Sequence, residues 1–188
     1  MMTIVIGGSG SGKSEYAEGV AVANGPSDKE RFYIATMQPF GSETLAKIAR
    51  HHELRKNKGF TTMEQYVDVY KAADQVSTES CVLLECMSNL LANEVYRPER
   101  REFGLENDQA VVEKVVKDIL KLEAACSHLI LVTNDIFASG ETYDPQTMRY
   151  VEMLGQINKR LVKNADTVVE VVCGIPLVIR KKSGKEES

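Results

Sequence analysis

The 188-residue sequence contains no apolar stretch that approaches the roughly 20 residues needed to span a membrane as a helix. Its first residues, MMTIVIGG, have no basic segment before the apolar residues and no small-residue cleavage site after them, so they do not predict a signal peptide. The net charge of −4 disfavours non-specific binding to nucleic acid. These absences predict a soluble, cytoplasmic protein with no membrane span and no nucleic-acid partner.

Cysteine is scarce and scattered, with four residues at Cys81, Cys86, Cys126 and Cys173. They form no Cys-x-x-Cys pair and no histidines cluster around them, so the sequence predicts neither a zinc site nor a disulfide framework. We expect free thiols, most of them buried.

Short β-branched runs alternate with longer helical patterns along the chain: TIVIG precedes EYAEGVAVA, CVLLEC precedes MSNLLANEV, and HLILVT precedes QTMRYVEMLGQINKRLVKN. This alternation is typical of crossover helices packed on a mainly parallel sheet. In TVVEVVCGIPLVIR, Gly174 and Pro176 separate two β runs, which predicts an antiparallel hairpin at the edge of the sheet. The sequence therefore predicts an α/β fold.

The length suits one ordinary domain, and 43% hydrophobic with 27% charged residues is near the average of soluble domains. No linker or repeat divides the chain, so we expect a single domain over residues 1–180 and a charged, disordered tail at 181–188. Residues 97–107 are highly charged without periodicity and are predicted to form a loop. Asn107 or Asp108 is expected to cap the helix that follows.

A glycine-rich segment, GGSGSGKS, follows the first apolar run directly and precedes a helical pattern. It satisfies G-x-x-x-x-G-K-[ST] in the strand and helix context that this motif requires. The segment comprises Gly7, Gly8, Ser9, Gly10, Ser11, Gly12, Lys13 and Ser14. Backbone N–H groups would face the phosphates, Lys13 would lie near the β and γ phosphates, and the Ser14 hydroxyl would bind Mg²⁺. We therefore expect a nucleoside triphosphate here, the alternative being a flexible turn that matches by chance.

An acidic residue at the end of another strand should hold or orient the metal. Glu85 ends CVLLE and Asp135 follows LILVTN, both at carboxyl ends of predicted parallel strands, where ligands bind in such sheets. Glu85 is the stronger candidate because four apolar residues precede it directly. The alternative for either residue is a surface carboxylate at a strand end.

The segment SETLAKIARHHELR holds two of the three histidines and predicts a helix capped by Ser42. One stripe is polar and recurs every four residues, at Glu43, Lys47, His51 and Arg55. The other follows the spacing of a buried face, at Leu45, Ile48 and His52.

The two histidines are therefore expected to differ in role. His52 is predicted to pack or to make one structural hydrogen bond. His51 lies between Lys47 and Arg55, a cationic setting that favours the neutral, nucleophilic imidazole. Arg55 could bind a phosphate in bidentate fashion. An exposed polar stripe without a catalytic role remains the alternative.

Taken together, several segments resemble the bifunctional adenosylcobinamide kinase / adenosylcobinamide-phosphate guanylyltransferase family of cobalamin biosynthesis. They are GGSGSGKSEYAE, YIATMQ, KIARHHELR, FTTMEQY, VLLECMSNLLANE, LVTND and GQINKRLVKNADTVVEVVCGIPLVI. The combination is specific where the glycine-rich loop alone is not.

The resemblance implies a three-layer, RecA-like P-loop domain and a homotrimer. It implies phosphorylation of adenosylcobinamide by a nucleoside triphosphate, GTP or ATP, and transfer of GMP from GTP through a guanylylated histidine. The family spacing of four residues from histidine to arginine matches His51 with Arg55 and does not match His52. Beyond the glycine-rich loop, the implied nucleotide site contains Thr36, Met37, Gln38, His52, Glu53, Leu54, Arg55, Glu64 and Glu85.

The chain departs from the family pattern after LVTN, where DIFASGETYDP, residues 135–145, stands in place of a glycine-rich segment. Val151 also replaces an arginine common in the family. This loop is expected to contact the corrinoid, so the departure bears on acceptor choice and on the kinase half. Two other functions stay open: a P-loop small-molecule kinase without a covalent intermediate, and a nucleotide-dependent regulator.

Overall fold

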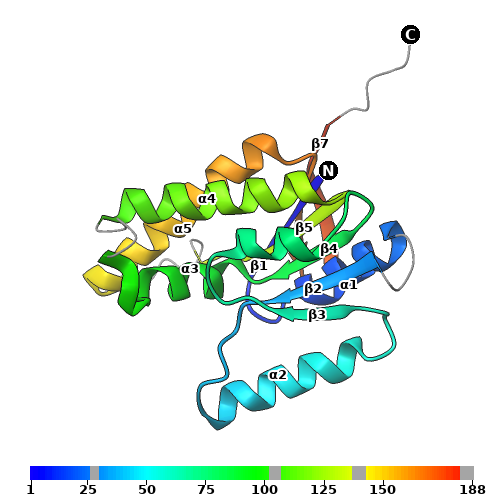
Figure 1. Cartoon of the computed structure of the whole chain (residues 1–188), viewed down its shortest axis with the longest axis horizontal. Helices are drawn as coiled ribbons and strands as arrows, with labels where there is room; N and C mark the ends of the chain where they lie inside the picture. The colour runs from blue at the N-terminus through cyan, green and yellow to red at the C-terminus, as the bar shows by residue number, and fades with distance from the viewer. Residues whose placement is uncertain (26–29, 102–106, 137–142, 183–188) are drawn as a thin grey trace.

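The computed structural model describes residues 1–25, 30–101, 107–136 and 143–182 (Figure 1). A seven-stranded sheet runs in the order β3-β2-β4-β5-β1-β6-β7. Its strands are β1 (Met2–Gly7), β2 (Arg31–Ala35), β3 (Thr61–Glu64), β4 (Cys81–Glu85), β5 (His128–Asn134), β6 (Thr167–Val172) and β7 (Ile175–Lys181). All neighbouring pairs are parallel except β6 and β7, which form the predicted antiparallel hairpin.

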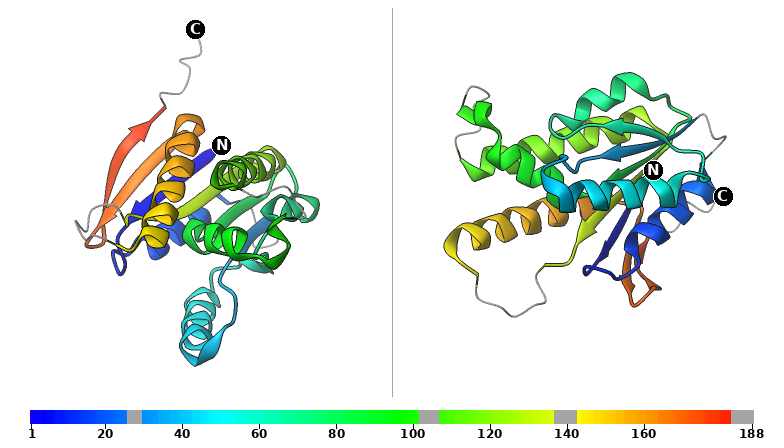
Figure 2. Two further views of the ribbon diagram at one scale, coloured as in Figure 1. Left: turned by 90° about the vertical axis from the view of Figure 1, so that its left-hand side faces the viewer. Right: turned by 90° about the horizontal axis from the view of Figure 1, so that it is seen from below.

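Helices cover both faces of this sheet, which confirms the predicted three-layer α/β fold (Figures 1 and 2). The helices are α1 (Lys13–Asn24), α2 (Gly41–Arg55), η2 (Val69–Gln75), α3 (Met87–Tyr96), η3 (Pro98–Arg101), α4 (Asp108–Ala125) and α5 (Pro145–Asn164). Helix α1 packs on one face, and η2, α3, α4 and α5 pack on the other. Helix α2 lies beside β3, apart from both layers. Within the described ranges, no helix has the length and apolar character that a membrane crossing requires.

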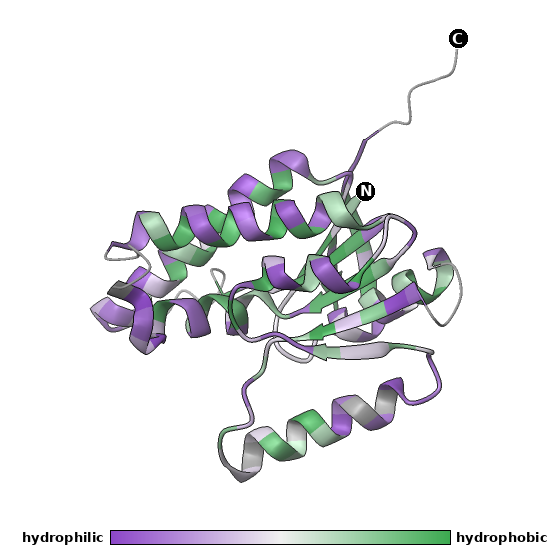
Figure 3. Ribbon diagram, viewed as in Figure 1, coloured by the Kyte–Doolittle hydropathy of each residue, from purple (hydrophilic) through white to green (hydrophobic). Residues whose placement is uncertain are grey.

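The core follows from the alternation of side chains along the buried strands. In β5, Leu129 and Leu131 face α3, α4 and α5, whereas Ile130 and Val132 face α1. Apolar residues therefore fill the central strands almost continuously, while the helices are apolar only on their inner sides (Figure 3). This arrangement places the carboxyl ends of β1, β2, β4 and β5 along one edge of the sheet.

Local signals at the helix ends had mixed outcomes. The Asn107 side chain accepts a hydrogen bond of 2.8 Å from the Ala110 amide, so the predicted cap of α4 is confirmed. The predicted Ser42 cap is wrong, because α2 begins at Gly41 and Phe40 precedes it without a side-chain cap. Gly41 has a φ of 75°, which lets the chain enter the helix two residues earlier than a Ser42 cap would.

Strand β7 reaches Lys181, and residues 183–188 of the predicted tail lie outside the described residues. The domain boundary at residue 180 therefore stays a prediction. Strand β7 itself is unusual, because four of its apolar side chains are exposed by 46–62%: Ile175, Leu177, Val178 and Ile179.

A buried cluster of charges joins η2, α3 and α4. The carboxylates of Asp68, Glu94 and Asp118 lie close together, and the Lys114 ammonium group is within 2.6–2.8 Å of all three. Burial opposes ionisation of Asp68, but hydrogen bonds from Lys114 and Arg97 outweigh it and hold its pKa well below the usual value. The lysine thus occupies the position between the carboxylates that a cation would need, and the cluster ties the elements together.

His128 at the start of β5 is 3% exposed, and its Nε2 shares a hydrogen bond of 2.8 Å with the Thr3 hydroxyl. Burial, with the nearby amino terminus, lowers the pKa of His128 from 6.5 to about 4. The unfolded chain therefore takes up a proton as the pH falls below 6.5, while the folded chain stays neutral at this site until about pH 4. Stability is lost in that window as the pH falls.

Replacing His128 by glutamine should remove this pH dependence. Between pH 7 and pH 5 the wild type should lose about 2 kcal/mol more unfolding free energy than His128→Gln, since one pKa unit corresponds to about 1.4 kcal/mol. Urea titrations at the two pH values measure the difference. An equal loss of unfolding free energy in both proteins would mean that folded His128 is protonated at pH 5, as it is in the unfolded chain.

Candidate active site

The glycine-rich loop joins β1 to α1 and requires its glycines at defined positions. A Cβ on Gly7 would lie 2.7 Å from the Val171 carbonyl oxygen, too close for any side chain. Gly10 and Gly12 have φ values of 71° and 89°, which favour glycine. The Lys13 ammonium group donates a 3.0 Å hydrogen bond to the Gly8 carbonyl, so it lies within the loop. The residues thus form a P-loop at the amino end of α1.

The turn between β6 and β7 supports this loop from outside. The Gly174 amide donates a hydrogen bond of 2.8 Å to the Ser11 carbonyl, and a Cβ on Gly12 would meet the Gly174 Cα at 3.3 Å. The C-terminal hairpin therefore helps to fix the loop's conformation.

Glu85, the last residue of β4, lies beside the P-loop as predicted from its strand-end position. Its carboxylate accepts hydrogen bonds from the Ser14 hydroxyl at Oε1 and from the Tyr33 hydroxyl, 3.1 Å from Oε2. Burial, reinforced by the Glu85 charge, raises the pKa of Tyr33, so the phenol remains a donor. A serine hydroxyl beside a carboxylate offers the oxygen ligands that Mg²⁺ prefers, so these residues fit the ion.

Two cavities meet in front of the P-loop. The larger, about 710 Å³, is lined by the P-loop and by residues of α1, α2 and α3. The smaller, about 220 Å³, lies between α2 and the ends of β2 and β3. His51 lines both cavities, as do Met37 and Glu85. A nucleophile at this junction could reach a group bound in either.

Arg55 is buried rather than part of an exposed stripe. Its guanidinium group lies 3.5 Å over the ring of Tyr33, and only 5% of the residue is exposed. Its Nε and Nη1 have no hydrogen-bond partner among the side chains and backbone that the structure describes, although the residue lines the smaller cavity. A buried cation with unused donors is suited to an anionic or carbonyl-bearing ligand.

The predicted buried face of α2 is wrong at Leu45, which is 53% exposed. Ile48 is half-buried and lines the smaller cavity. The reason is that α2 does not pack flat on the sheet, so helical spacing alone assigns its faces incorrectly. The side chains of Glu43, Lys47, His52 and Leu54 lie outside the described ones.

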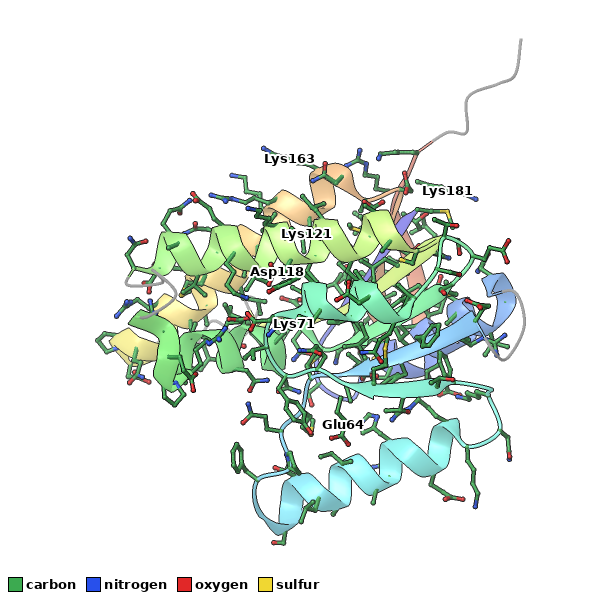
Figure 4. All side chains as sticks on the ribbon, in the orientation of Figure 1. Glu64, Lys71, Asp118, Lys121, Lys163 and Lys181 are labelled. Carbon is green, nitrogen blue, oxygen red and sulfur yellow. The ribbon has the colours of Figure 1, made fainter. Side chains whose placement is uncertain are left out.

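The far wall of the smaller cavity carries Glu64 at the end of β3, directed towards α2 (Figure 4), and Tyr66, whose hydroxyl donates a 2.8 Å hydrogen bond to Glu64. Burial and that hydrogen bond raise the pKa of Tyr66 to about 12. The Asn93 amide donates to the carbonyls of Thr36 and Tyr66, at 2.8 and 2.9 Å, and so joins the loops after β2 and β3. Thr36 itself is fully buried and its hydroxyl bonds the backbone at Glu85 and Cys86.

Most predicted site residues come together here. Those that line a cavity are Ser9, Gly10, Ser11, Gly12, Lys13, Ser14, Met37, His51, Arg55, Glu64 and Glu85. Five predicted residues in the described part of the chain line neither cavity: Gly7, Gly8, Thr36, Gln38 and Glu53. Asn134 rather than Asp135 lines the larger one. Residues 137–142 of the divergent loop lie outside the described residues.

Sequence reasoning missed several lining residues: Tyr33, Arg50, Lys58 and Asn89. Tyr33 begins YIATMQ, one of the segments that resemble the family. The prediction used only Thr36, Met37 and Gln38 from this segment, although the family resemblance already included Tyr33. Lys58 follows α2 and pairs with the buried Glu18 of α1 at 2.5 Å, a contact between distant segments that no local pattern indicates.

The sequence model of the family described as cobinamide kinase / cobinamide phosphate guanyltransferase matches residues 3–179. Relatives from Salmonella typhimurium and Escherichia coli, each named bifunctional adenosylcobalamin biosynthesis protein CobU, are each 30% identical over 96% of this chain and 100% of their own. A relative from Pseudomonas aeruginosa, named CobP, is 24% identical over 96% of this chain and 98% of its own.

A solved ATPase domain is similar in structure, with a TM-score of 0.56 at 9% identity, over 97% of this chain and 78% of that one. This likeness agrees with a P-loop fold. The family match over nearly the whole chain agrees with the motifs that first indicated it, and the chain therefore belongs to the cobinamide kinase / cobinamide phosphate guanyltransferase family.

Proposed function

We propose that this transferase phosphorylates adenosylcobinamide with a nucleoside triphosphate and transfers GMP from GTP to the product through a guanylylated His51. The assignment of His51 rests on its position where the larger cavity, called the P-loop cavity below, meets the smaller cavity. The second histidine of the helix lacks the family spacing to Arg55.

The transfer is written as two displacements at one phosphorus. A neutral ring nitrogen of His51 attacks the α-phosphorus of GTP, so that a P–N bond forms, the bond to the bridging oxygen breaks, and pyrophosphate leaves. A phosphate oxygen of adenosylcobinamide phosphate then attacks the same phosphorus and the P–N bond breaks. The products are adenosylcobinamide-GDP and free His51.

The P-loop residues would hold the phosphates in both half-reactions. Lys13 and the loop amides would neutralise the β and γ phosphates, and Ser14 with Glu85 would hold Mg²⁺, which supplies further positive charge to the phosphates when bound. In the smaller cavity, the Glu64 carboxylate suits the N–H donors of guanine, and Arg55 suits a phosphate or carbonyl oxygen. Met37 would contact the nucleotide from both cavities; roles for Thr36, Gln38, His52, Glu53 and Leu54 stay predictions.

Intact-mass measurement after incubation with GTP and Mg²⁺ tests the proposal. Covalent gain of one GMP group is expected, and the adduct should be labile to acid and stable to alkali, as a phosphoramidate is. A small-molecule kinase would transfer phosphate without gaining mass, and a nucleotide-dependent regulator would bind and slowly hydrolyse the nucleotide only. Either result would contradict a guanylylated intermediate.

Replacing Glu85 by glutamine should weaken the proposed Mg²⁺ site while keeping oxygen and shape. Glutamine keeps one oxygen that accepts from either the Ser14 or the Tyr33 hydroxyl, and the other hydroxyl can turn to accept from its NH2 group, so the melting temperature should change little. The Mg²⁺ concentration for half-maximal labelling should rise by roughly 10- to 100-fold, as for residues that orient metal ligands. A collapse of stability with normal activity per folded molecule would assign Glu85 a structural role instead.

We further propose a homo-oligomer, a trimer by analogy with the family, acting in the cytoplasm. The exposed apolar side chains of β7 support self-association, because neighbouring exposed apolar side chains can form a contiguous patch of the kind that marks an interface. Sedimentation at micromolar concentration should give a mass well above 20.9 kDa, and a monomer would contradict the proposal.

A further inference from the structure

A third cavity, about 390 Å³, lies between the C-terminal end of α3 and the N-terminal half of α5. No residue of the P-loop, α2, β2 or β3 lines it, so it is separate from both cavities of the candidate active site. Its walls include Tyr96, Arg100, Gln146, Arg149, Tyr150 and Met153. None of these residues has a role in the nucleotide chemistry proposed above.

The walls combine flat apolar surface with hydrogen-bond donors. Tyr96 is 57% exposed, and its hydroxyl accepts a 3.1 Å hydrogen bond from the Gln146 amide. Arg149 donates from Nε and Nη2 to Asp108, each at 2.6 Å, and its Nη1 has no partner among the described residues. Because Asp108 also accepts from Arg100, two guanidinium groups share one carboxylate. The unused Nη1 of Arg149 favours a ligand that offers a carbonyl oxygen.

Tyr150 connects this cavity to the active site. Its ring lines the third cavity, and its hydroxyl donates a 2.7 Å hydrogen bond to the carbonyl of Ser88, which lines the P-loop cavity. Ser88 and Tyr96 are eight residues apart on α3, which corresponds to about 12 Å along the helix axis. A substrate could therefore extend from the P-loop along α3 into the third cavity.

We propose that the third cavity binds the carboxamide-bearing edge of the corrin ring of the acceptor, an inference that rests on the proposed function. In cobinamide the hydroxyl that receives phosphate is on an aminopropanol arm, several bonds from the macrocycle, so a ring that delivers this hydroxyl to the P-loop must lie beyond the P-loop cavity. The ring edge is apolar and carries amide side chains. Tyr96 and Met153 would pack against the apolar ring edge. Arg149 and Gln146 would donate hydrogen bonds to the oxygens of the amide side chains.

Two substitutions in the cavity test the proposal. Gln146→Trp fills it from an exposed position, and Arg149→Gln removes the charged donor while leaving an amide for Asp108. Met148→Trp is the matched control, because Met148 is on the opposite side of α5 and does not line the cavity. Equilibrium dialysis with adenosylcobinamide, followed by its visible absorption, measures binding without relying on turnover. Labelling by GTP is measured on the same samples.

In both cavity variants the dissociation constant for adenosylcobinamide should rise about tenfold or more, equivalent to ~1.4 kcal/mol. Their labelling by GTP and their melting temperatures should stay at the wild-type values, as should all three measurements for Met148→Trp. Unchanged corrinoid binding in both cavity variants would overturn the proposal, as would an equal loss in Met148→Trp. A wild type that binds adenosylcobinamide through this cavity but gains no GMP would refute His51 transfer and leave the cavity's assignment standing.

Discussion

Incubation of His51→Ala with GTP and Mg²⁺ is expected to give no GMP adduct, whereas the wild type is labelled. Alanine removes the ring nitrogen that would form the P–N bond. Among the side chains that the structure describes at the junction of the two cavities, none offers an equivalent nucleophile: the Cys86 thiol lies there, but burial raises its pKa and keeps it protonated. Because His51 is only half-buried and helical, its loss should leave the melting temperature nearly unchanged.

His52→Ala provides the control on the same turn of α2. It should keep most of the labelling, since the family spacing to Arg55 assigns the nucleophile to His51. Full labelling of His51→Ala together with none of His52→Ala would show that the register assigned to the helix is wrong. An adduct in both variants that resists acid would identify a residue other than histidine.

The parts of the fold that the sequence predicted well depend on contacts close along the chain. The P-loop needs its glycines because Gly7, Gly10 and Gly12 have close neighbours or positive φ, and that requirement is visible in the motif. The hairpin at Gly174 and the Asn107 cap are equally local. Glu85 was identified because a carboxylate ending a buried run at a parallel strand's carboxyl end has few structural reasons to be there.

Helix α2 shows where such reasoning fails. Its residues were assigned to faces by spacing, yet Leu45 is exposed and Arg55 is buried against Tyr33. Those positions follow from where α2 lies beside β3, and the Lys58–Glu18 ion pair that fixes its C-terminal end joins segments 40 residues apart. The third cavity was likewise invisible, because α3, α4 and α5 form it jointly. Tertiary contacts between distant segments leave no periodic signal in the sequence.

Lys13→Ala is expected to reduce both the phosphorylation of adenosylcobinamide and the labelling by GTP. Each half-reaction requires the charge of a triphosphate to be neutralised as it develops on the departing or transferred phosphate. Lys13 is 9% exposed, so water would replace its ammonium group poorly. Removing one such group commonly costs about 10²- to 10³-fold in rate, and a loss of that size is expected in each assay. Initial rates at saturating Mg²⁺ measure it.

Lys163→Ala is a suitable control, because it removes an exposed lysine in the last turn of α5 that does not line any of the three cavities. It should leave both rates unchanged, which would exclude a general effect of losing one positive charge.

The comparison between the two activities of Lys13→Ala is the informative one. With a single P-loop holding the phosphates, both rates must fall together; a variant that lost labelling but phosphorylated adenosylcobinamide normally would require a second nucleotide site. The two half-reactions would then not share the cavity in front of the P-loop, and His51 would serve only the nucleotide bound there.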